Sequence, residues 1–339
     1  PKNIESAIIV LGGLNRPYTG EEQTVEIVSV TLPDGDGVNL ERDIDYTVKD
    51  NSNTATDVAK IVLTIEGMGN YTGTAEKTWA ITKAAPELGN FDVTPDLSQK
   101  QIYNGNQQKV TAVHKNGVNG MGEVKVYYEG TDGTTYTRSE TAPTNAGSYK
   151  VILTVAEGTN YTAAEIEAGT LTIEKATLKV EDITEFFEYT KTGAQTINLA
   201  ELVPGATNYA LGTAAGDIGV LSEAITIDET AGLMKFALSA LTKGNVDNKV
   251  TVPVTITSEN YEEVTVNVII YISPEYRIID GANSSWTQNT DGTVVIRGDG
   301  EFNRFHAVKV DGKVIDRTNY EAKAGSTIIT LKAEYLKTL

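Results

Sequence analysis

The sequence predicts an all-β protein made of tandem immunoglobulin-like β-sandwich domains in an elongated array. Three observations carry this prediction. Val, Ile and Thr fill short runs, and Gly, Asn and Asp interrupt them every ~8–12 residues, as in sandwich proteins. One phrase, an alternating strand followed by a turn that ends in Asn-Tyr, occurs in residues 61–71, 151–161 and 252–261. Its spacing of roughly 90 residues indicates tandem domains, each with its own core.

The repeated phrase also predicts which residues face the core of each domain. Alternate side chains of a strand point to the same face. The apolar residues expected in the core are therefore Ile61, Leu63, Ile65, Val151, Leu153, Val155, Val252, Val254 and Ile256. In the turn, Asn is expected to take a positive φ, and the Tyr ring is expected to pack across the mouth of the hairpin.

Two single residues carry further expectations about these strands. Trp79 alternates with Ile81, which predicts a core position for its ring. Pro253 interrupts the third copy of the strand. Because proline cannot donate a hydrogen bond to a ladder, the strand that contains it is expected at a sheet edge or with a bulge.

A second phrase opens each of the first three domains. Tyr18-Thr19-Gly20 recurs as Tyr103-Asn104-Gly105 and, more loosely, in residues 189–193. In each copy, Tyr closes a strand and Gly makes the turn. The two phrases together predict four domains, 1–83, 84–175, 176–273 and 274–339. The joints between them contain few residues, so the array is expected to be semi-rigid.

Composition excludes several classes of site. The chain of 339 residues has no Cys and two His, which excludes disulfides, zinc–thiolate sites and Cys nucleophiles, and disfavours a His-rich metal site. No run of 18 apolar residues is present, so no membrane insertion is expected. The chain begins at Pro1 without the basic and apolar regions of a signal peptide, which favours an excised fragment of a longer protein.

Charge divides the chain into an acidic part and a neutral part. Residues 274–339 hold nine Lys/Arg and nine Asp/Glu, so the net charge of −18 belongs to the preceding 273 residues. An acidic surface of this kind repels nucleic acid and anionic membranes and favours solubility. We therefore expect no nucleic-acid partner, and a monomeric chain.

The first two domains resemble the bacterial immunoglobulin-like repeats of Gram-positive surface proteins, including the MBG-type repeats of mucin-binding adhesins. The matching residues are Tyr18-Thr19-Gly20, Asp45-Tyr46-Thr47-Val48, Gly69-Asn70-Tyr71-Thr72-Gly73 and the Lys-Ala joints. The resemblance covers roughly residues 5–175 and implies a secreted or cell-wall-attached, extracellular protein. The third domain shares only its last hairpin with this pattern and is expected to be a divergent relative.

The fourth domain resembles the X2-like immunoglobulin modules found beside carbohydrate-active and surface proteins. The matching residues are Val308-Lys309-Val310-Asp311-Gly312, Asn319-Tyr320, Gly325 to Leu331 and Tyr335-Leu336. The resemblance implies mostly a spacer role, with carbohydrate or cell-wall binding in some members. Because the X2-like pattern continues with a turn and a closing strand, this domain is expected to lack its last strand.

One acidic stretch is a candidate calcium site. Asp34, Asp36, Asp43 and Asp45, together with Glu41, supply the carboxylate oxygens that Ca²⁺ prefers. The stretch departs from an EF-hand loop, because Asn39 stands where that loop has Gly. A solvated hairpin loop is the competing interpretation. Calcium is the one cofactor that the sequence allows as a candidate, and the expectation is that no cofactor is bound.

Trp286 is the candidate carbohydrate-binding residue. It lies in the polar segment 283–289, where an exposed indole face could stack on a sugar ring. The competing interpretation is that Trp286 anchors the small core of the fourth domain.

No pair of carboxylates and no Gly-rich phosphate loop stands out, so no catalytic residue is expected. We interpret the chain as a non-enzymatic, extracellular fragment of a bacterial cell-surface protein, with adhesive or spacer modules. Its expected partner is a host or cell-wall glycan or glycoprotein. The alternative is an accessory carbohydrate-binding region of a secreted carbohydrate-active enzyme. A cell-wall anchor after the fragment would favour the first reading, and a catalytic domain before it the second.

Overall fold

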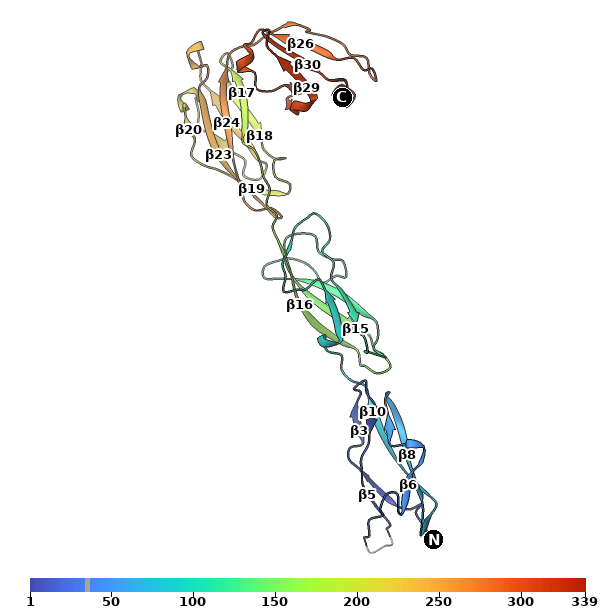
Figure 1. Ribbon diagram of the computed structural model, residues 1–339. Helices are drawn as coiled ribbons and strands as arrows, with labels where there is room; N and C mark the ends of the chain where they lie inside the picture. Colours follow the sequence, from blue (N-terminus) through green and yellow to red (C-terminus); the bar gives the residue numbers. More distant parts are fainter. Residues whose placement is uncertain (34–36) are drawn as a thin grey trace. The chain divides into compact units, whose positions relative to one another are not determined.

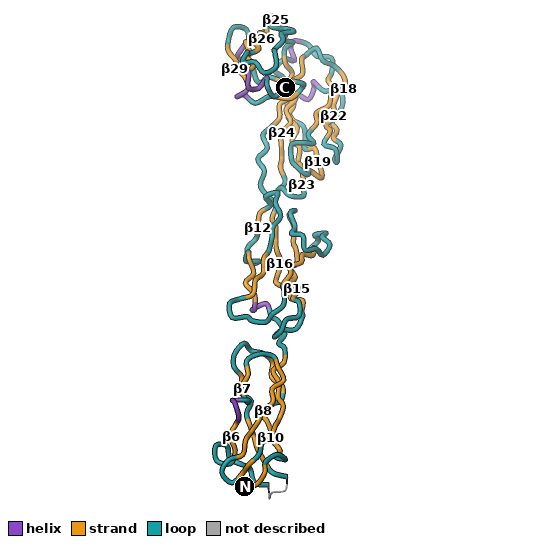
Figure 2. The backbone as a smooth tube through the Cα atoms, turned by 90° about the vertical axis from the view of Figure 1, so that its right-hand side faces the viewer, coloured by secondary structure: helices purple, strands orange, loops and turns teal. Residues whose placement is uncertain are grey.

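The computed structural model describes residues 1–33 and 37–339, and it is nearly all β (Figures 1 and 2). The chain divides into two compact units, Pro1–Thr177 with Glu259–Glu262, and Leu178–Ser258 with Glu263–Leu339. The tandem immunoglobulin-like β-sandwich architecture predicted from sequence is confirmed. Among the described residues, helix is confined to short segments: α1 (Ala333–Leu336) and the 3₁₀ turns η1 (Lys49–Asn51), η2 (Leu88–Asn90), η3 (Ile218–Val220), η4 (Lys243–Asn245), η5 (Phe302–Arg304) and η6 (Arg317–Asn319).

The first module is a sandwich built on one four-stranded sheet of order β3-β10-β8-β6. These strands are β3 (Asn15–Pro17), β10 (Thr74–Thr82), β8 (Ala59–Gly67) and β6 (Tyr46–Val48). The facing pairs are β2 (Ile8–Leu11) with β5 (Ile27–Thr31), β4 (Gln23–Thr24) with β7 (Thr54–Ala55), and β1 (Lys2–Asn3) with β9 (Tyr71–Thr72). The short strand β3 runs parallel to the closing strand β10.

The second module repeats this arrangement. Its main sheet has the order β12-β16-β15-β14, and β12 again runs parallel to the closing strand. The strands are β12 (Gln101–Ile102), β16 (Ala164–Glu174), β15 (Gly147–Val155) and β14 (Val124–Thr131), and the facing pair is β11 (Phe91–Thr94) with β13 (Thr111–His114). The repeat in sequence is therefore a repeat in topology.

The third module keeps the same main sheet, of order β17-β24-β23-β19, with β17 parallel to the closing strand. These strands are β17 (Ile183–Glu188), β24 (Val264–Ser273), β23 (Lys249–Ser258) and β19 (Ala206–Leu211), and β20 (Ala215–Gly216) also pairs with β23. The second sheet consists of β18 (Gly193–Asn198), β22 (Leu233–Leu238) and β21 (Thr226–Ile227).

The fourth module is built on a different, antiparallel sheet of order β25-β26-β30-β29. Its strands are β25 (Ile278–Asp280), β26 (Val294–Gly298), β30 (Thr327–Leu331) and β29 (Tyr320–Lys323), beside the small hairpin β27 (Lys309–Val310) and β28 (Lys313–Val314). Its core gathers Ile315, Tyr320, Ile329, Leu331 and Leu336. Leu336 belongs to α1, so this helical turn closes one end of the core.

The alternating strands bury the residues that the pattern predicted. Eight of the nine predicted core residues are buried, and Ile61 is half-buried. Trp79 is 1% exposed, and its Nε1 donates a hydrogen bond to the Ser52 carbonyl over 3.2 Å, so the predicted core position is confirmed. A buried indole stabilises a core by its apolar area provided that its N–H finds a partner, as it does here.

The prediction of an edge strand or a bulge at Pro253 is wrong. β23 lies inside its sheet, between β24 and β19, and Pro253 pairs in regular register with Asn267 of β24. On the other side, the neighbouring chain passes from β19 to β20 at this level, and Gly212 N donates to the Pro253 carbonyl over 2.7 Å. Proline has no N–H to donate. At Pro253 the backbone faces the gap between β19 and β20, where no strand carbonyl requires a donor from this residue.

The sequence prediction for the turns is right for the Gly residues and wrong for Asn70. Gly20, Gly105 and Gly193 take positive φ angles of 86°, 77° and 78°, as the second phrase predicted. In the first Asn-Tyr turn, however, the described residue with a positive φ is Gly69, not Asn70. The Asn of this phrase is therefore required for something other than backbone conformation.

Candidate functional site: the joints between repeats

The first joint connects the first and second modules through their backbones, within the first unit. Ala84 forms a parallel bridge with Tyr161. Ala84 N donates to the Asn160 carbonyl over 3.0 Å, and Thr162 N donates to the Ala84 carbonyl over 2.9 Å. The residue after Lys83 is thus bound into the Asn-Tyr turn of the next module. We call the Asn-Tyr dipeptide and its two neighbours the tip, here residues 159–162.

The side chain of Asn160 extends from the tip into the first module. Asn160 is 5% exposed. Its Oδ1 accepts from Val58 N over 3.2 Å, and its Nδ2 donates to Asp57 Oδ1 over 3.1 Å. Nδ2 also lies 3.4 Å from the Asn119 carbonyl of its own module. Asn suits this position because a buried amide can accept and donate at once, and each of its polar atoms here has a partner.

The Tyr of the same tip packs against the Tyr of the second phrase. The rings of Tyr161 and Tyr18 meet edge to face, with centroids 5.4 Å apart and an interplanar angle of 79°. Both side chains are buried, and Tyr161 is part of the core cluster of the first module. Burial raises the pKa of the Tyr161 phenol, with a smaller contribution from Tyr18. The sequence prediction that Tyr packs across its own hairpin mouth is therefore wrong for this copy: the ring reaches into the neighbouring module.

A second joint with the same pattern lies within the first unit and uses tip residues Glu259–Glu262. Ala176 N donates to the Asn260 carbonyl, and Glu262 N donates to the Ala176 carbonyl, each over 3.0 Å. The Tyr103 and Tyr261 rings meet edge to face at 5.5 Å.

The Asn side chain of this second tip is held as in the first joint. Asn260 Oδ1 accepts from Ala146 N over 2.8 Å, and Asn260 Nδ2 donates to Asn145 Oδ1 over 3.2 Å.

The residues that bind the tip Asn occupy equivalent positions in the two joints. Asp57-Val58 and Asn145-Ala146 are the two residues that precede β8 and β15. In both joints, the first residue of this pair accepts from the tip Asn and the second donates to it through its backbone. The joint is therefore a repeated arrangement, and it explains why Asn and Tyr recur together.

A third contact uses the equivalent position within the second unit. Asp247 is the second residue before β23, and its Oδ1 accepts from Arg304 Nη1 over 2.7 Å and from the Tyr271 hydroxyl over 2.5 Å. The Tyr271 hydroxyl, and then Arg304, hold the pKa of the Asp247 carboxyl below its usual range. Lys309 Nζ pairs with Glu185 over 2.5 Å, and the His306 ring lies 4.9 Å from that of Phe186.

Sequence reasoning missed the joint residues Asp57, Asn145 and Asp247. A signal was available: an Asx residue stands two positions before each long central strand, and Asn precedes Tyr in each tip. Sequence alone did not connect the two signals, because the partners are about 100 residues apart and meet only in the tertiary structure.

The calcium candidates are only partly described. Asp34 and Asp36 lie outside the described residues. Asp43 lies 3.9 Å from Arg42, and Asp45 Oδ2 accepts from Glu41 N over 2.9 Å. No group of three or more metal-ligating side chains is found among the residues that the structure describes.

Trp286, the candidate sugar-binding residue, is half-buried. Its side chain packs against the core of the fourth module, and its Nε1 donates to the Gly292 carbonyl over 2.7 Å. One part of the indole thus contacts the core while another part remains accessible. Trp286 belongs to the fourth module, whereas Asp43 and Asp45 belong to the first.

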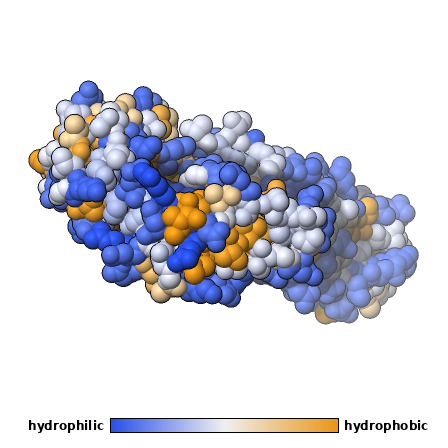
Figure 3. All heavy atoms as spheres, turned by 90° about the horizontal axis from the view of Figure 1, so that it is seen from above, coloured by the Kyte–Doolittle hydropathy of each residue, from blue (hydrophilic) through white to orange (hydrophobic). Residues whose placement is uncertain are grey.

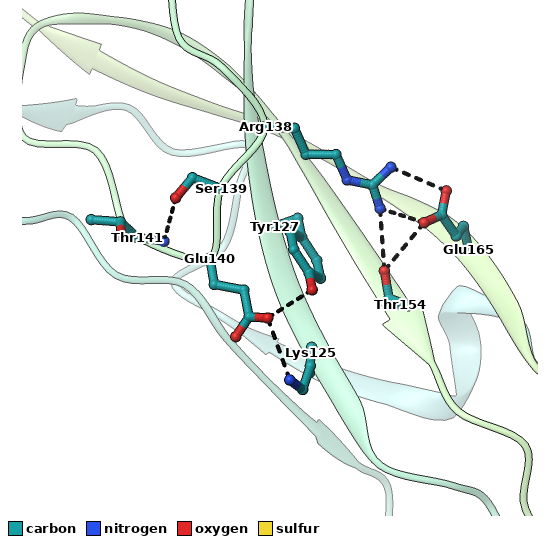
Figure 4. Close-up of polar contacts among 8 residues, drawn as sticks. All are labelled: Lys125, Tyr127, Arg138, Ser139, Glu140, Thr141, Thr154 and Glu165. Atoms are coloured by element: carbon teal, nitrogen blue, oxygen red, sulfur yellow. Dashed lines mark hydrogen bonds and ion pairs between the residues drawn. The ribbon is translucent and has the colours of Figure 1, made fainter.

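One face of the main sheet of the second module carries a network of polar side chains (Figure 4). Arg138 binds Glu165 through both Nη atoms, contacts Thr154 Oγ1 at 3.3 Å, and lies over the Tyr127 ring at 4.9 Å. The Tyr127 hydroxyl donates to Glu140 over 2.7 Å and lowers the pKa of that carboxyl. Because the charges of this exposed network pair with one another, it solubilises the sheet face and offers no free cation or anion as a binding group.

The second module also contains an open cavity of about 530 Å³. Tyr136 and Tyr149 meet edge to face in its wall at 5.3 Å, and Glu259 of the second tip borders it. Both hydroxyls are engaged: Tyr136 donates to the Thr141 carbonyl and Tyr149 to the Asn145 carbonyl, each over 2.8 Å. The remaining lining residues are mostly small and polar, which suits a polar ligand more than an apolar one.

The surface is largely hydrophilic on the face shown in Figure 3, with apolar side chains in separate patches. None of the helices in the described part of the chain has the length and apolar character that a membrane span requires.

The fold and the repeated joint define a class of protein, tandem immunoglobulin-like β-sandwich repeats. Within this class, residues 7–85 and 94–177 each match the family model described as MBG domain. These segments make up just under half of the chain, and the two adjacent matches support tandem MBG-type repeats. A comparison with curated proteins finds no match.

Similarities to solved structures were also found. The chain is similar to the extracellular domains 3–5 of Drosophila OTK, with 14% identity, 74% of this chain and 90% of that chain covered, and a TM-score of 0.26. The human desmocollin-1 ectodomain gives 11% identity, 97% and 74% coverage, and a TM-score of 0.21. An endo-fucoidan hydrolase from glycoside hydrolase family 107 has 13% identity and a TM-score of 0.25, with 78% of this chain and 43% of that chain covered. At these TM-scores the likenesses carry no argument about function.

Proposed function

We propose that this chain is a non-enzymatic, extracellular segment of a bacterial cell-surface protein, and that it acts as a semi-rigid spacer. The observation that carries the proposal is the repeated joint, in which each tip sets a hydrogen-bonded Asn amide and an aromatic ring against the neighbouring repeat. Backbone, side-chain and ring contacts together fix an orientation that a short linker alone would leave free. Secreted or cell-wall-attached MBG-type repeats of Gram-positive bacteria fit this use, and the proposal keeps the four domains 1–83, 84–175, 176–273 and 274–339, the last of them X2-like.

The absence of Cys from the chain makes a sharp test possible, because two introduced cysteines are the only labelling sites. Spin labels at Glu22→Cys and Glu129→Cys, both exposed positions, report the distance between the first and second modules. We expect a narrow distance distribution that broadens when Asn160 and Tyr161 are both replaced by Ala. The matched control is Asn70→Ala, which changes the equivalent Asn outside the joint. A broad distribution in the parent chain would contradict a spacer role.

A second candidate function, glycan binding, is favoured by one observation, the polar cavity beside Tyr136 and Tyr149. It would place a host or cell-wall glycan in the second module, in addition to the sugar platform predicted at Trp286. A glycan array probed with the full chain, and with variants Glu259→Gln and Trp286→Ala, tests both places. Binding that only Glu259→Gln weakens assigns the ligand to the cavity. An array without any binding removes this candidate and leaves the spacer proposal standing.

A further inference from the structure

The first module carries a tip of its own, residues 69–72, whose backbone is bound like the tips of the two joints. Lys2 N donates to the Asn70 carbonyl over 2.9 Å, and β1 pairs in parallel with β9 so that Lys2 lies opposite Tyr71. Lys2 therefore holds the position that Ala84 and Ala176 hold in the joints. In both joints this residue comes two positions after the closing strand of the module that receives the tip.

The side chains of this tip lack the partners that the joints supply. Asn70 is exposed, whereas Asn160 is 5% exposed, and within the described residues the Asn70 side chain makes no hydrogen bond. Tyr71 is half-buried against the core of its own module, and no aromatic ring pairs with it in the described part of the chain. The tip thus has the backbone of a joint, while its Asn70 side chain is exposed and its Tyr71 ring is half-buried.

We propose that Asn70 and Tyr71 form a docking surface for one further MBG-type repeat, whose closing strand leads into Lys2. In the occupant, an Asp or Asn two positions before the long strand would accept a hydrogen bond from Asn70 Nδ2. It would donate a backbone N–H to Asn70 Oδ1, and it would place the Tyr of a Tyr-x-Gly turn against the Tyr71 ring. These are the groups that Asp57, Val58 and Tyr18 present to the second module.

A second copy of the chain is a poorer occupant. The receiving surfaces marked by Tyr18 and Tyr103 are already filled by Tyr161 and Tyr261. A second copy would have to release one of its own joints before it could bind Asn70. The path of the chain through Lys2 also places the receiving module on the amino-terminal side, as in both closed joints. This inference rests on the proposed spacer function and extends it by one repeat.

The test compares the full chain with a fusion in which a copy of residues 1–83 is joined directly before Lys2. Lys83 of the copy then precedes Lys2 as it precedes Ala84 in the native sequence. Nuclear magnetic resonance follows the side-chain amide of Asn70 in both proteins. We expect new chemical shifts and roughly tenfold slower exchange of this amide with solvent in the fusion, because a docked amide exchanges only after local opening. Asn70→Ala should release the docked copy in the fusion and leave the parent chain unchanged.

A second fusion, with a copy of residues 84–175 before Lys2, provides a control in case the copy of residues 1–83 folds poorly. Asn70 amide signals that stay unchanged beside a folded copy overturn the proposal. A copy that stays unfolded in both fusions also overturns it, since a matching surface should support the fold. Concentration-dependent self-association through Asn70 in the parent chain would assign the surface to a second copy instead and contradict the proposed occupant. If docking fails but Asn160→Ala still loosens the first joint, only this inference falls and the spacer function stands.

Discussion

Asp57 Oδ1 accepts a hydrogen bond from Asn160 Nδ2 over 3.1 Å, although the two residues lie 103 positions apart in the chain. The same relationship recurs between Asn145 and Asn260. In the second unit, Asp247 uses the same position for Arg304. The Asp or Asn two positions before each of these long strands thus accepts a hydrogen bond. The donor is an Asn amide in the first two modules and the Arg304 guanidinium in the third. This position is a general acceptor for a neighbouring module.

Asn160→Ala is expected to destabilise the first joint by about 1–3 kcal/mol, because it removes the hydrogen bonds that the buried Asn160 amide makes with Val58 N and Asp57 Oδ1. Hydrogen exchange at Val58 and Ala84 should accelerate, and the melting temperature should fall. Asn70→Ala is the matched control, because the equivalent Asn is exposed, and it should have no effect on the melting temperature. Equal effects of the two variants would show that the buried amide does not support the joint.

The ring contact between Tyr18 and Tyr161 is expected to contribute about 0.5–1.5 kcal/mol beyond the area it buries. A double-mutant cycle with Tyr18→Leu and Tyr161→Leu measures this coupling directly by chemical denaturation. Tyr18 paired with the distant Tyr103 gives the control cycle, for which no coupling is expected. A coupling near zero in the first cycle would reduce the contact to simple burial.

The contact of Asp247 with Arg304 is expected to weaken in acid. Hydrogen bonds from Tyr271 and Arg304 lower the pKa of the folded Asp247 below its unfolded value of about 3.9. The stabilising contribution is therefore complete above about pH 4 and is lost as the pH falls through the lower, folded pKa. Titration of the Asp247 carboxyl by nuclear magnetic resonance checks the direction of this shift. Asp247→Asn should keep the acceptor, as Asn145 does, and remove the acid dependence.

Trp286→Ala is expected to destabilise the fourth module by about 3 kcal/mol, the lower end of the range for truncated aromatic core residues, because the ring is only half-buried. Trp286→Phe should recover most of this loss, since it keeps the packing and loses only the hydrogen bond to Gly292. Unfolding of the full chain, monitored at the fourth module, measures both changes. Loss of sugar binding by Trp286→Ala without loss of stability would favour the glycan platform over the core anchor.

Calcium is expected to leave the first module unchanged. If the stretch with Asp34, Asp36, Asp43 and Asp45 bound Ca²⁺, the metal would stabilise the folded chain by mass action. Differential scanning calorimetry in millimolar calcium and in chelator compares the two conditions. A higher melting temperature in calcium, abolished by Asp43→Asn together with Asp45→Asn, would contradict this expectation and establish the site.

The sequence by itself determined the fold class, the repeats and most of the core. These properties follow from local rules, since the alternation of Val, Ile and Thr selects a buried face and Gly at positive φ sets the turns. Leu63, Val151 and Val254 are accordingly buried as the pattern requires. The resemblance to MBG-type repeats in residues 5–175 agrees with the two segments that match the family.

Only the tertiary structure decided what the Asn-Tyr phrase does. Its pattern in sequence is equally compatible with a turn that requires a positive φ and with a contact to another module. Which of these is realised depends on Asp57, Val58 and Tyr18, whose approach to Asn160 and Tyr161 is a long-range event that no local rule encodes. Pro253 shows the same limit, because its tolerance inside a sheet depends on where the neighbouring strand happens to break. Local preferences fix the elements, and the pairing of distant surfaces fixes how those elements join.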